Sequence, residues 1–103
     1  MTDAPQDQPE LFEAFWDRDQ VDALFADLKQ GANIRQVQVR TISGNNRPSD
    51  TTVGLEQAHQ LLDHGDTKAI QVYYDYDGNS WCDTLMPTPE AIRIVRTTIP
   101  SDR

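Results

Sequence analysis

The chain has 103 residues and a formal net charge of −8, and this length predicts one domain with one modest core. A negative surface repels nucleic-acid phosphates and anionic membranes, so the charge predicts no nucleic-acid or membrane binding and favours a basic partner protein. The acidity is uneven, because residues 1–30 hold eight acidic residues against Arg18 and Lys29.

The sequence carries no signal for secretion or membrane insertion. Its first ten residues, MTDAPQDQPE, have neither the basic nor the apolar region of a signal peptide. No apolar run approaches the roughly 18 residues that a spanning helix needs. The single cysteine, Cys82, cannot form an intrachain disulfide. These features predict a cytoplasmic location.

The N-terminal third predicts a polar lead followed by helix. We expect residues 1–8 to be disordered, the domain to span residues 9–100, and residues 101–103 to fray. Apolar residues recur at helical spacing over residues 9–30, which predicts either one bent helix or two helices. The apolar positions are Leu11, Phe12, Phe15, Trp16, Val21, Leu24, Phe25 and Leu28.

This helical segment has recognisable boundaries. Asp17 or Asp19 is expected to cap the start of its second half, and Gly31 is expected to end it. The aromatic residues near its start are expected to enter the core. Because they lie close to a terminus, docking on another chain is the alternative.

The next segment predicts a strand and then a loop. Residues 34–42 alternate between apolar and polar side chains, with Gln36, Gln38 and Arg40 on the expected solvent face. Residues 43–51, SGNNRPSDT, combine glycine, asparagine, proline and serine, which is typical of a loop.

A further helix is expected after this loop, ending at Gly65. Its cap is expected to be Asp50, Thr51 or Thr52. Its apolar stripe consists of Leu55, Ala58, Leu61 and Leu62. His59 and His64 are five positions apart, about 140° around a helix, so they do not face one ligand together. We expect structural or solvent-exposed roles for both.

Residues 68–86 predict a β-hairpin around which the rest of the chain is organised. Two alternating runs flank Asp77-Gly78, a dipeptide typical of a type I′ turn, in which both residues have positive φ. After the turn, Trp81, Asp83 and Leu85 share the inward face. An inward carboxylate needs a partner, and we expect Asp83 near the sheet edge, hydrated or bonded to a loop amide.

Residues 91–99 are rich in β-branched side chains, which favours a strand, although Thr88 and Pro89 would also suit a helix start. The predicted fold is a small α+β domain of order α-β-α-β-β-β. Its mainly antiparallel four-stranded sheet carries two or three helices on one face, and residues 68–99 form a meander within it.

No sequence motif predicts catalysis, a metal or a cofactor. Asp75 to Met86 places oxygens as a calcium loop does, but Ser80 and Met86 replace the required glycine and bidentate glutamate. Cys82 is expected within a strand and not at a helix N-terminus, where the thiolate would be stabilised. The loop at Arg47 offers an anion donor, but it lacks the phosphate-binding glycine spacing.

The exposed sheet face is the better candidate surface, because tyrosine and arginine commonly anchor protein interfaces. The candidate binding residues are Arg40, Arg47, Tyr73, Asp75, Cys82 and Asp83. We expect a non-catalytic accessory or adaptor domain that binds another protein or self-associates. The alternative is a small-ligand-binding protein or enzyme with a pocket between loop 43–51 and hairpin 68–86.

Overall fold

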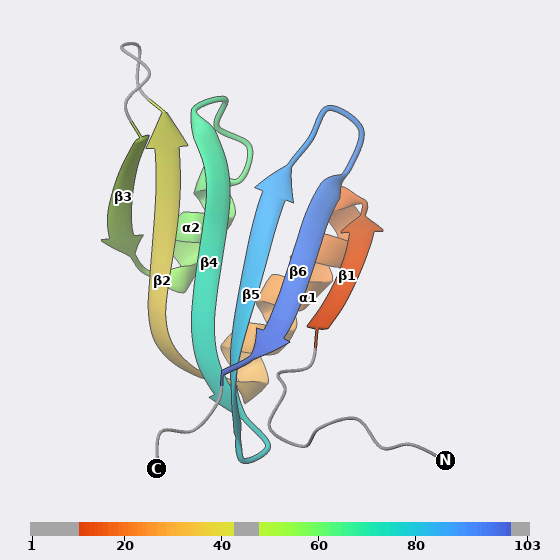
Figure 1. The fold of residues 1–103 in the computed structure, drawn as a ribbon, viewed down its shortest axis with the longest axis vertical. Helices are drawn as coiled ribbons and strands as arrows, with labels where there is room; N and C mark the ends of the chain where they lie inside the picture. The colour runs from red at the N-terminus through yellow and green to blue at the C-terminus, as the bar shows by residue number, and fades with distance from the viewer. Residues whose placement is uncertain (1–10, 43–47, 100–103) are drawn as a thin grey trace.

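A computed structural model of the protein describes residues 11–42 and 48–99. Within these residues the chain forms six strands in one antiparallel sheet and two helices that cover one face of it (Figure 1). The elements are β1 (Leu11–Trp16), α1 (Arg18–Gly31), β2 (Asn33–Ile42), β3 (Pro48–Val53), α2 (Leu55–Leu61), β4 (Thr67–Tyr76), β5 (Asn79–Pro87) and β6 (Ile92–Thr98).

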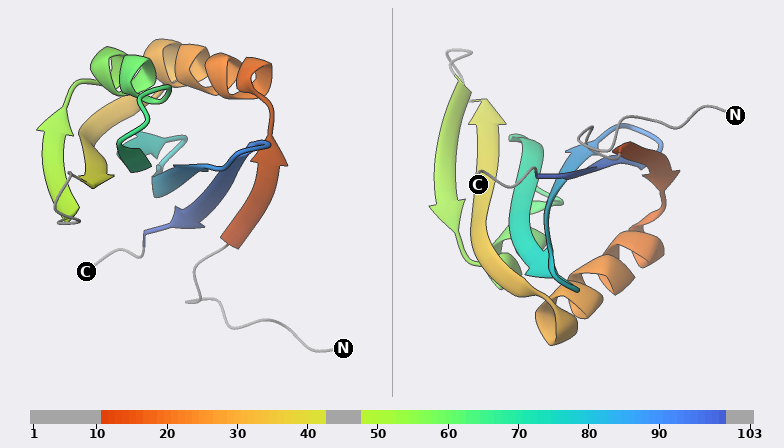
Figure 2. Two further views of the ribbon diagram at one scale, coloured as in Figure 1. Left: turned by 90° about the horizontal axis from the view of Figure 1, so that it is seen from above. Right: turned by 60° about the horizontal axis from the view of Figure 1, so that its bottom comes forward.

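The strand order is β1-β6-β5-β4-β2-β3, so β1 and β3 form the two edges. Helix α1 carries the chain from the β1 edge to β2, and α2 carries it from the β3 edge to β4. The last three strands form a meander. The sheet curves around the helices, which lie next to each other against its concave face (Figure 2).

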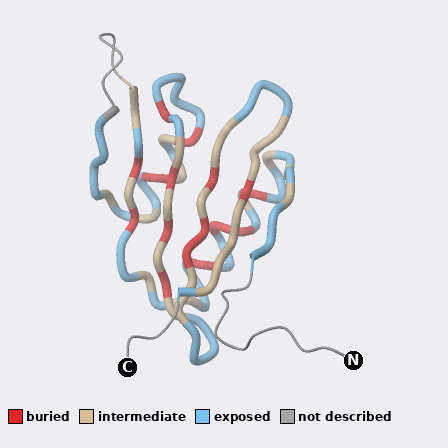
Figure 3. Tube along the Cα trace, in the orientation of Figure 1, coloured by how far each residue is buried: buried red, intermediate tan, exposed pale blue. Residues whose placement is uncertain are grey.

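The core lies between this concave face and the helices. Figure 3 shows buried positions alternating with more exposed ones along the central strands. The largest fully buried side chains come from every central strand and from α1: Val21, Val37, Val39, Ile70, Val72, Asp83, Leu85 and Ile94. Because side chains alternate along each strand, the buried residues lie on the face that the helices cover, and the other face is uncovered.

Helix α1 begins and ends where its sequence predicts. The Asp17 carboxylate accepts from the Gln20 backbone N–H, and the Gln20 side chain accepts from the Asp17 backbone N–H. This capping box satisfies two N–H groups that the helix start leaves unpaired. The helix ends at Gly31, and its buried stripe is Val21, Leu24, Phe25 and Leu28.

The predicted hairpin and meander are confirmed. Asp77 and Gly78 have φ angles of 54° and 80°, the positive values that a type I′ turn needs. Strands β4 and β5 pair on either side of this turn, and β6 follows as a strand. The preference for a strand over a helix after Pro89 was therefore correct.

The predicted four-stranded sheet is wrong, because the sheet has six strands. One missed strand is β1, predicted as helix. Its sequence, LFEAFW, is apolar at five of six positions, so it fits helical and strand spacing equally well. Pairing with β6 decides the outcome, since Ala14 lies opposite Ile94 and Trp16 opposite Ile92 on the core side.

The second missed strand is β3, whose residues were predicted as loop and helix cap. Its sequence, PSDTTV, is mostly polar and carries no apolar alternation, yet it pairs with β2 along its length. The cap of α2 is Gly54, which makes no side-chain hydrogen bond, and not a residue of 50–52. The predictions for residues 1–8, 101–103 and Arg47 lie outside the described residues.

Replacing Gly78 by alanine tests the hairpin turn. A Cβ at φ 80° is strained even in the open space around Gly78, so Gly78→Ala is expected to lower the free energy of unfolding by about 1 kcal/mol. Urea denaturation measures this change. Gly65→Ala is the control, because it meets neither a positive φ nor a close neighbour; equal losses in both variants would contradict the turn assignment.

Candidate functional site

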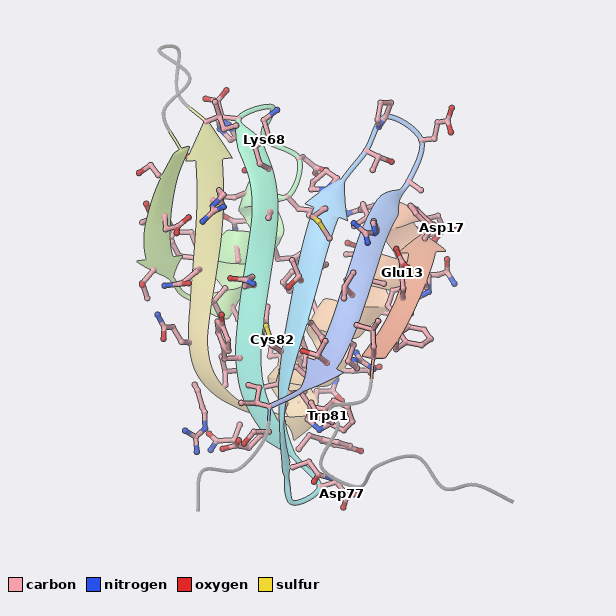
Figure 4. All side chains as sticks on the ribbon, in the orientation of Figure 1. Glu13, Asp17, Lys68, Asp77, Trp81 and Cys82 are labelled. Carbon is pink, nitrogen blue, oxygen red and sulfur yellow. The ribbon has the colours of Figure 1, made fainter. Side chains whose placement is uncertain are left out.

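Most of the predicted binding residues gather on the uncovered sheet face. The register places Gln38 opposite Gln71, and Tyr73 opposite both Gln36 and Cys82. Residues opposite each other in antiparallel strands share a face. Arg40, Tyr73, Asp75 and Cys82 therefore lie on one surface, and Figure 4 labels Cys82 near its middle.

The charges on this face are paired within the chain. Arg40 holds Asp50 through two hydrogen bonds of 2.9 and 3.2 Å, and these lower the pKa of Asp50. Asp75 accepts from Ser80 and from Arg35, each at 2.7 Å, and these bonds lower its pKa in that order. Such surface pairs bring little stability but leave little uncompensated charge.

Tyr73 and Cys82 are less available than the sequence indicates. The Tyr73 hydroxyl donates to the Gln71 side chain at 3.3 Å. Cys82 is buried, and this burial raises the pKa of its thiol. The thiol is therefore less acidic than a free cysteine, the opposite of what a nucleophile needs.

Asp83 lies on the other side of the sheet, so it does not join these residues. Its carboxylate is completely buried. Arg96 of β6 donates to both oxygens at 2.8 and 2.9 Å, and the Tyr74 hydroxyl bonds to them at 3.1 and 3.2 Å. The expectation of a hydrated edge position was wrong, because β5 is a central strand whose inward carboxylate is ion-paired.

Sequence reasoning missed Arg96 as the partner, although its signal was present. Ile94 of β6 is fully buried, and Arg96 is the next residue of the same parity. The β5–β6 register places Asp83 directly opposite Arg96. Two inward-facing, opposite charges on neighbouring strands were therefore implied by alternation, but their pairing depends on the register.

A polar cluster joins the two helices and was also missed. His59 of α2 stacks on Phe25 of α1 with ring centroids 4.3 Å apart, and its Nε2 lies 2.7 Å from Asp22. Hydrogen bonds from Arg18, and then from His59, lower the pKa of Asp22. Arg18 also pairs with Asp63. The cluster ties α1 to α2.

These helix residues border a cavity of about 330 Å³, which is mainly apolar. One histidine and one carboxylate can orient each other, but the cavity lining includes no serine, cysteine or threonine nucleophile. Across the described ranges, no group of three or more metal-ligating side chains occurs. The arrangement therefore fits a packing contact between helices.

Exposed apolar side chains concentrate on strand β1. Leu11, Phe12 and Phe15 are 69, 46 and 62 % exposed. Leu11 and Phe15 project from the uncovered face, whereas Phe12 projects from the helix side, where its ring lies 6.3 Å from that of Trp16. We call Leu11, Phe12 and Phe15, together with the open edge of their strand, the β1 surface.

A cavity of about 320 Å³ adjoins the Trp16 end of the β1 surface. Trp16, Leu62 and Ile92 contribute apolar walls, and its remaining lining residues are Asp17, Arg18, Asp63, Pro87, Thr88, Pro89, Glu90 and Ala91. Three carboxylates against one arginine make this end of β1 acidic.

The buried ion pair can be tested by removing one or both charges. Arg96→Ala leaves Asp83 buried without its cation and is expected to lower the free energy of unfolding by about 3–5 kcal/mol. The double variant Asp83→Leu, Arg96→Met is expected to recover most of this loss. Urea denaturation of the three proteins measures both effects; a double variant as unstable as Arg96→Ala would contradict the assignment.

Tyr74 predicts an alkaline limit to stability. Burial, and then the Asp83 charge, raise its pKa well above the ordinary 10.0. A group whose pKa is raised by folding stabilises the fold below its unfolded pKa, and this contribution is lost as pH rises above about 10. Tyr74→Phe is expected to cost about 1 kcal/mol at pH 7.

The Tyr74→Phe variant also tests whether folding raises the pKa of Tyr74. Between pH 9 and 11 the free energy of unfolding is expected to fall more steeply in the parent protein than in Tyr74→Phe. Chemical denaturation at several pH values measures both slopes, and identical slopes would contradict a raised pKa at Tyr74.

No helix among residues 11–42 and 48–99 is long and apolar enough to cross a membrane. Comparisons of the chain with protein-family models, curated proteins and solved structures found no match. Its functional interpretation therefore depends on its own geometry.

Proposed function

We propose that this chain is a non-catalytic accessory or adaptor domain that binds a protein through the β1 surface. The observation that carries the proposal is the exposure of Leu11, Phe12 and Phe15 on one edge strand. Large apolar side chains grouped at an unpaired sheet edge are costly in a monomer, because they invite association.

The contrast between the two edges supports this proposal. Strand β3, at the opposite edge, has the sequence PSDTTV, which begins with proline and carries a charge and three hydroxyl residues. Proline and charge protect an edge from pairing. Strand β1 has neither proline nor a positive charge, and its single acid, Glu13, is paired with Arg93.

The uncovered sheet face extends the β1 surface but supplies less of the proposed binding energy. Arg40 would have to leave Asp50, and Tyr73 would have to leave Gln71, before either could bind a partner. The exposed apolar side chains of β1 need no such exchange. We therefore place the main contact at β1 and treat Arg40 and Tyr73 as peripheral to it.

The test compares binding and stability in surface variants. The full chain is used to capture a partner, which is then purified and titrated, and light scattering measures self-association in parallel. Leu11→Ser with Phe15→Ser is expected to weaken either interaction at least tenfold, because central aromatic anchors commonly contribute about 2 kcal/mol or more. The thermal midpoint is expected to change by less than about 4 °C.

Tyr76→Ser is the matched control. Tyr76 is a large aromatic side chain that is 55 % exposed, but it lies at the β4–β5 hairpin, away from β1. Binding is expected to survive this change. A parent protein that remains monomeric and binds no purified protein would contradict the proposed function, as would equal losses in the two variants.

A further inference from the structure

We propose that the partner contributes an extended basic segment, which pairs antiparallel with the open edge of β1 and becomes the next strand of the sheet. Its first residues carry lysine or arginine side chains that lie over the acidic cavity at Trp16. This inference rests on the proposed function and adds the chemistry and orientation of the partner.

The edge geometry supports strand addition. Among the described residues, β1 pairs with β6 on one side and with no strand on the other. A strand with no described strand on one side can form a ladder there, which is how extended peptides commonly bind sheet edges. Phe12 lies on one face of the sheet, and Leu11 and Phe15 lie on the other, so an added strand meets apolar side chains on both faces.

The charge at the Trp16 end supports a basic partner. The cavity there has apolar walls and the carboxylates of Asp17, Asp63 and Glu90. Its only cation, Arg18, is already engaged by Asp22 and Asp63. Lysine and arginine suit this site, because their aliphatic stems cover apolar surface while the charged end reaches carboxylates.

The same reasoning disfavours a second copy of the chain. Two copies could pair antiparallel through their β1 strands around a two-fold axis, with the helices of both copies on the same face of the joined sheet. One register places Leu11 of one copy opposite Phe15 of the other, but it also places the two Glu13 side chains opposite each other. The next register sets Leu11 against Asp17. Like charges directly opposite each other destabilise strand pairs, and each protein would add a formal charge of −8. A basic strand avoids both conflicts.

The orientation follows from the alternation of the sheet. Every pairing in it is antiparallel, and β1 runs from Leu11 toward Trp16. An antiparallel neighbour therefore begins beside Trp16, at the end of β1 where Asp17 and Glu90 line the cavity.

The experiment uses the full chain and fluorescently labelled synthetic peptides. The basic probe is Lys-Arg-Val-Thr-Val-Tyr-Val-Thr, and its acidic counterpart begins Glu-Glu. Fluorescence anisotropy is expected to show at least tenfold tighter binding of the basic probe, and this preference is expected to shrink as salt rises. Glu90→Lys in the protein is expected to weaken the basic probe several-fold.

Glu56→Lys is the matched control, because it makes the same charge change at an exposed position on α2. Binding of the basic probe is expected to change much less in this variant. Two further probes carry N-methyl groups at alternate residues. In the first probe the methyl groups replace the N–H groups that would bond to β1, and binding is expected to be lost. In the second probe they replace the N–H groups that point away from β1, and binding is expected to remain.

Several results would overturn the inference. These are equal binding of basic and acidic probes, binding of both methylated probes, or no binding of the basic probe at about 1 mM. A stable dimer that Leu11→Ser with Phe15→Ser dissociates would show that a second copy occupies the edge. In that case the proposed function would stand; it fails only if no protein, including the chain itself, uses the β1 surface.

Discussion

The ion pair between Asp83 and Arg96 constrains the register between β5 and β6. A carboxylate that is completely buried is costly without a cation, and the bidentate bond from β6 supplies one in the centre of the molecule. Because side chains alternate between faces, a slip of one residue between β5 and β6 would carry Arg96 to the uncovered face and leave Asp83 unpaired. The pair therefore fixes the β5–β6 register, and through β6 it fixes the position of β1, whose inward residues pack opposite Ile92 and Ile94.

The charged side chains inside the sheet and on its uncovered face are paired within the chain, which fits the proposed association at the β1 surface. Asp83 is paired in the interior, and Arg40 and Asp75 are paired on the uncovered face. The helices are tied together by the contacts of His59 and Asp22. What is left is an edge strand with exposed apolar side chains and an acidic cavity at its end. A surface of this kind gains most from a ligand that adds both backbone hydrogen bonds and positive charge.

The central elements could be predicted from the sequence, and the edges could not. Helix α1 has a polar cap, a regular apolar stripe and a terminal glycine, and the β4–β5 hairpin has apolar alternation on both sides of Asp77-Gly78. These local signals agree with the tertiary structure. Strand β1 has apolar residues on both faces, and β3 has almost none, so neither shows the period of two that a half-buried strand produces. Arg96 illustrates a different limit: alternation predicts its direction, but only the register between strands identifies Asp83 as its partner.

The two edges also decide which assemblies the sheet can form. If β1 of one copy paired with β3 of the next, the contact would repeat without closing and would produce a filament. Strand β3 resists this pairing, because Pro48 lacks a backbone N–H and Asp50 is an ionisable side chain within the strand. Among the described edges, β1 is therefore the better site for an added strand. A sheet with one protected edge and one apolar edge fits the proposed domain that accepts one partner. A partner can pair with β1, but copies of the chain do not continue the assembly through β3.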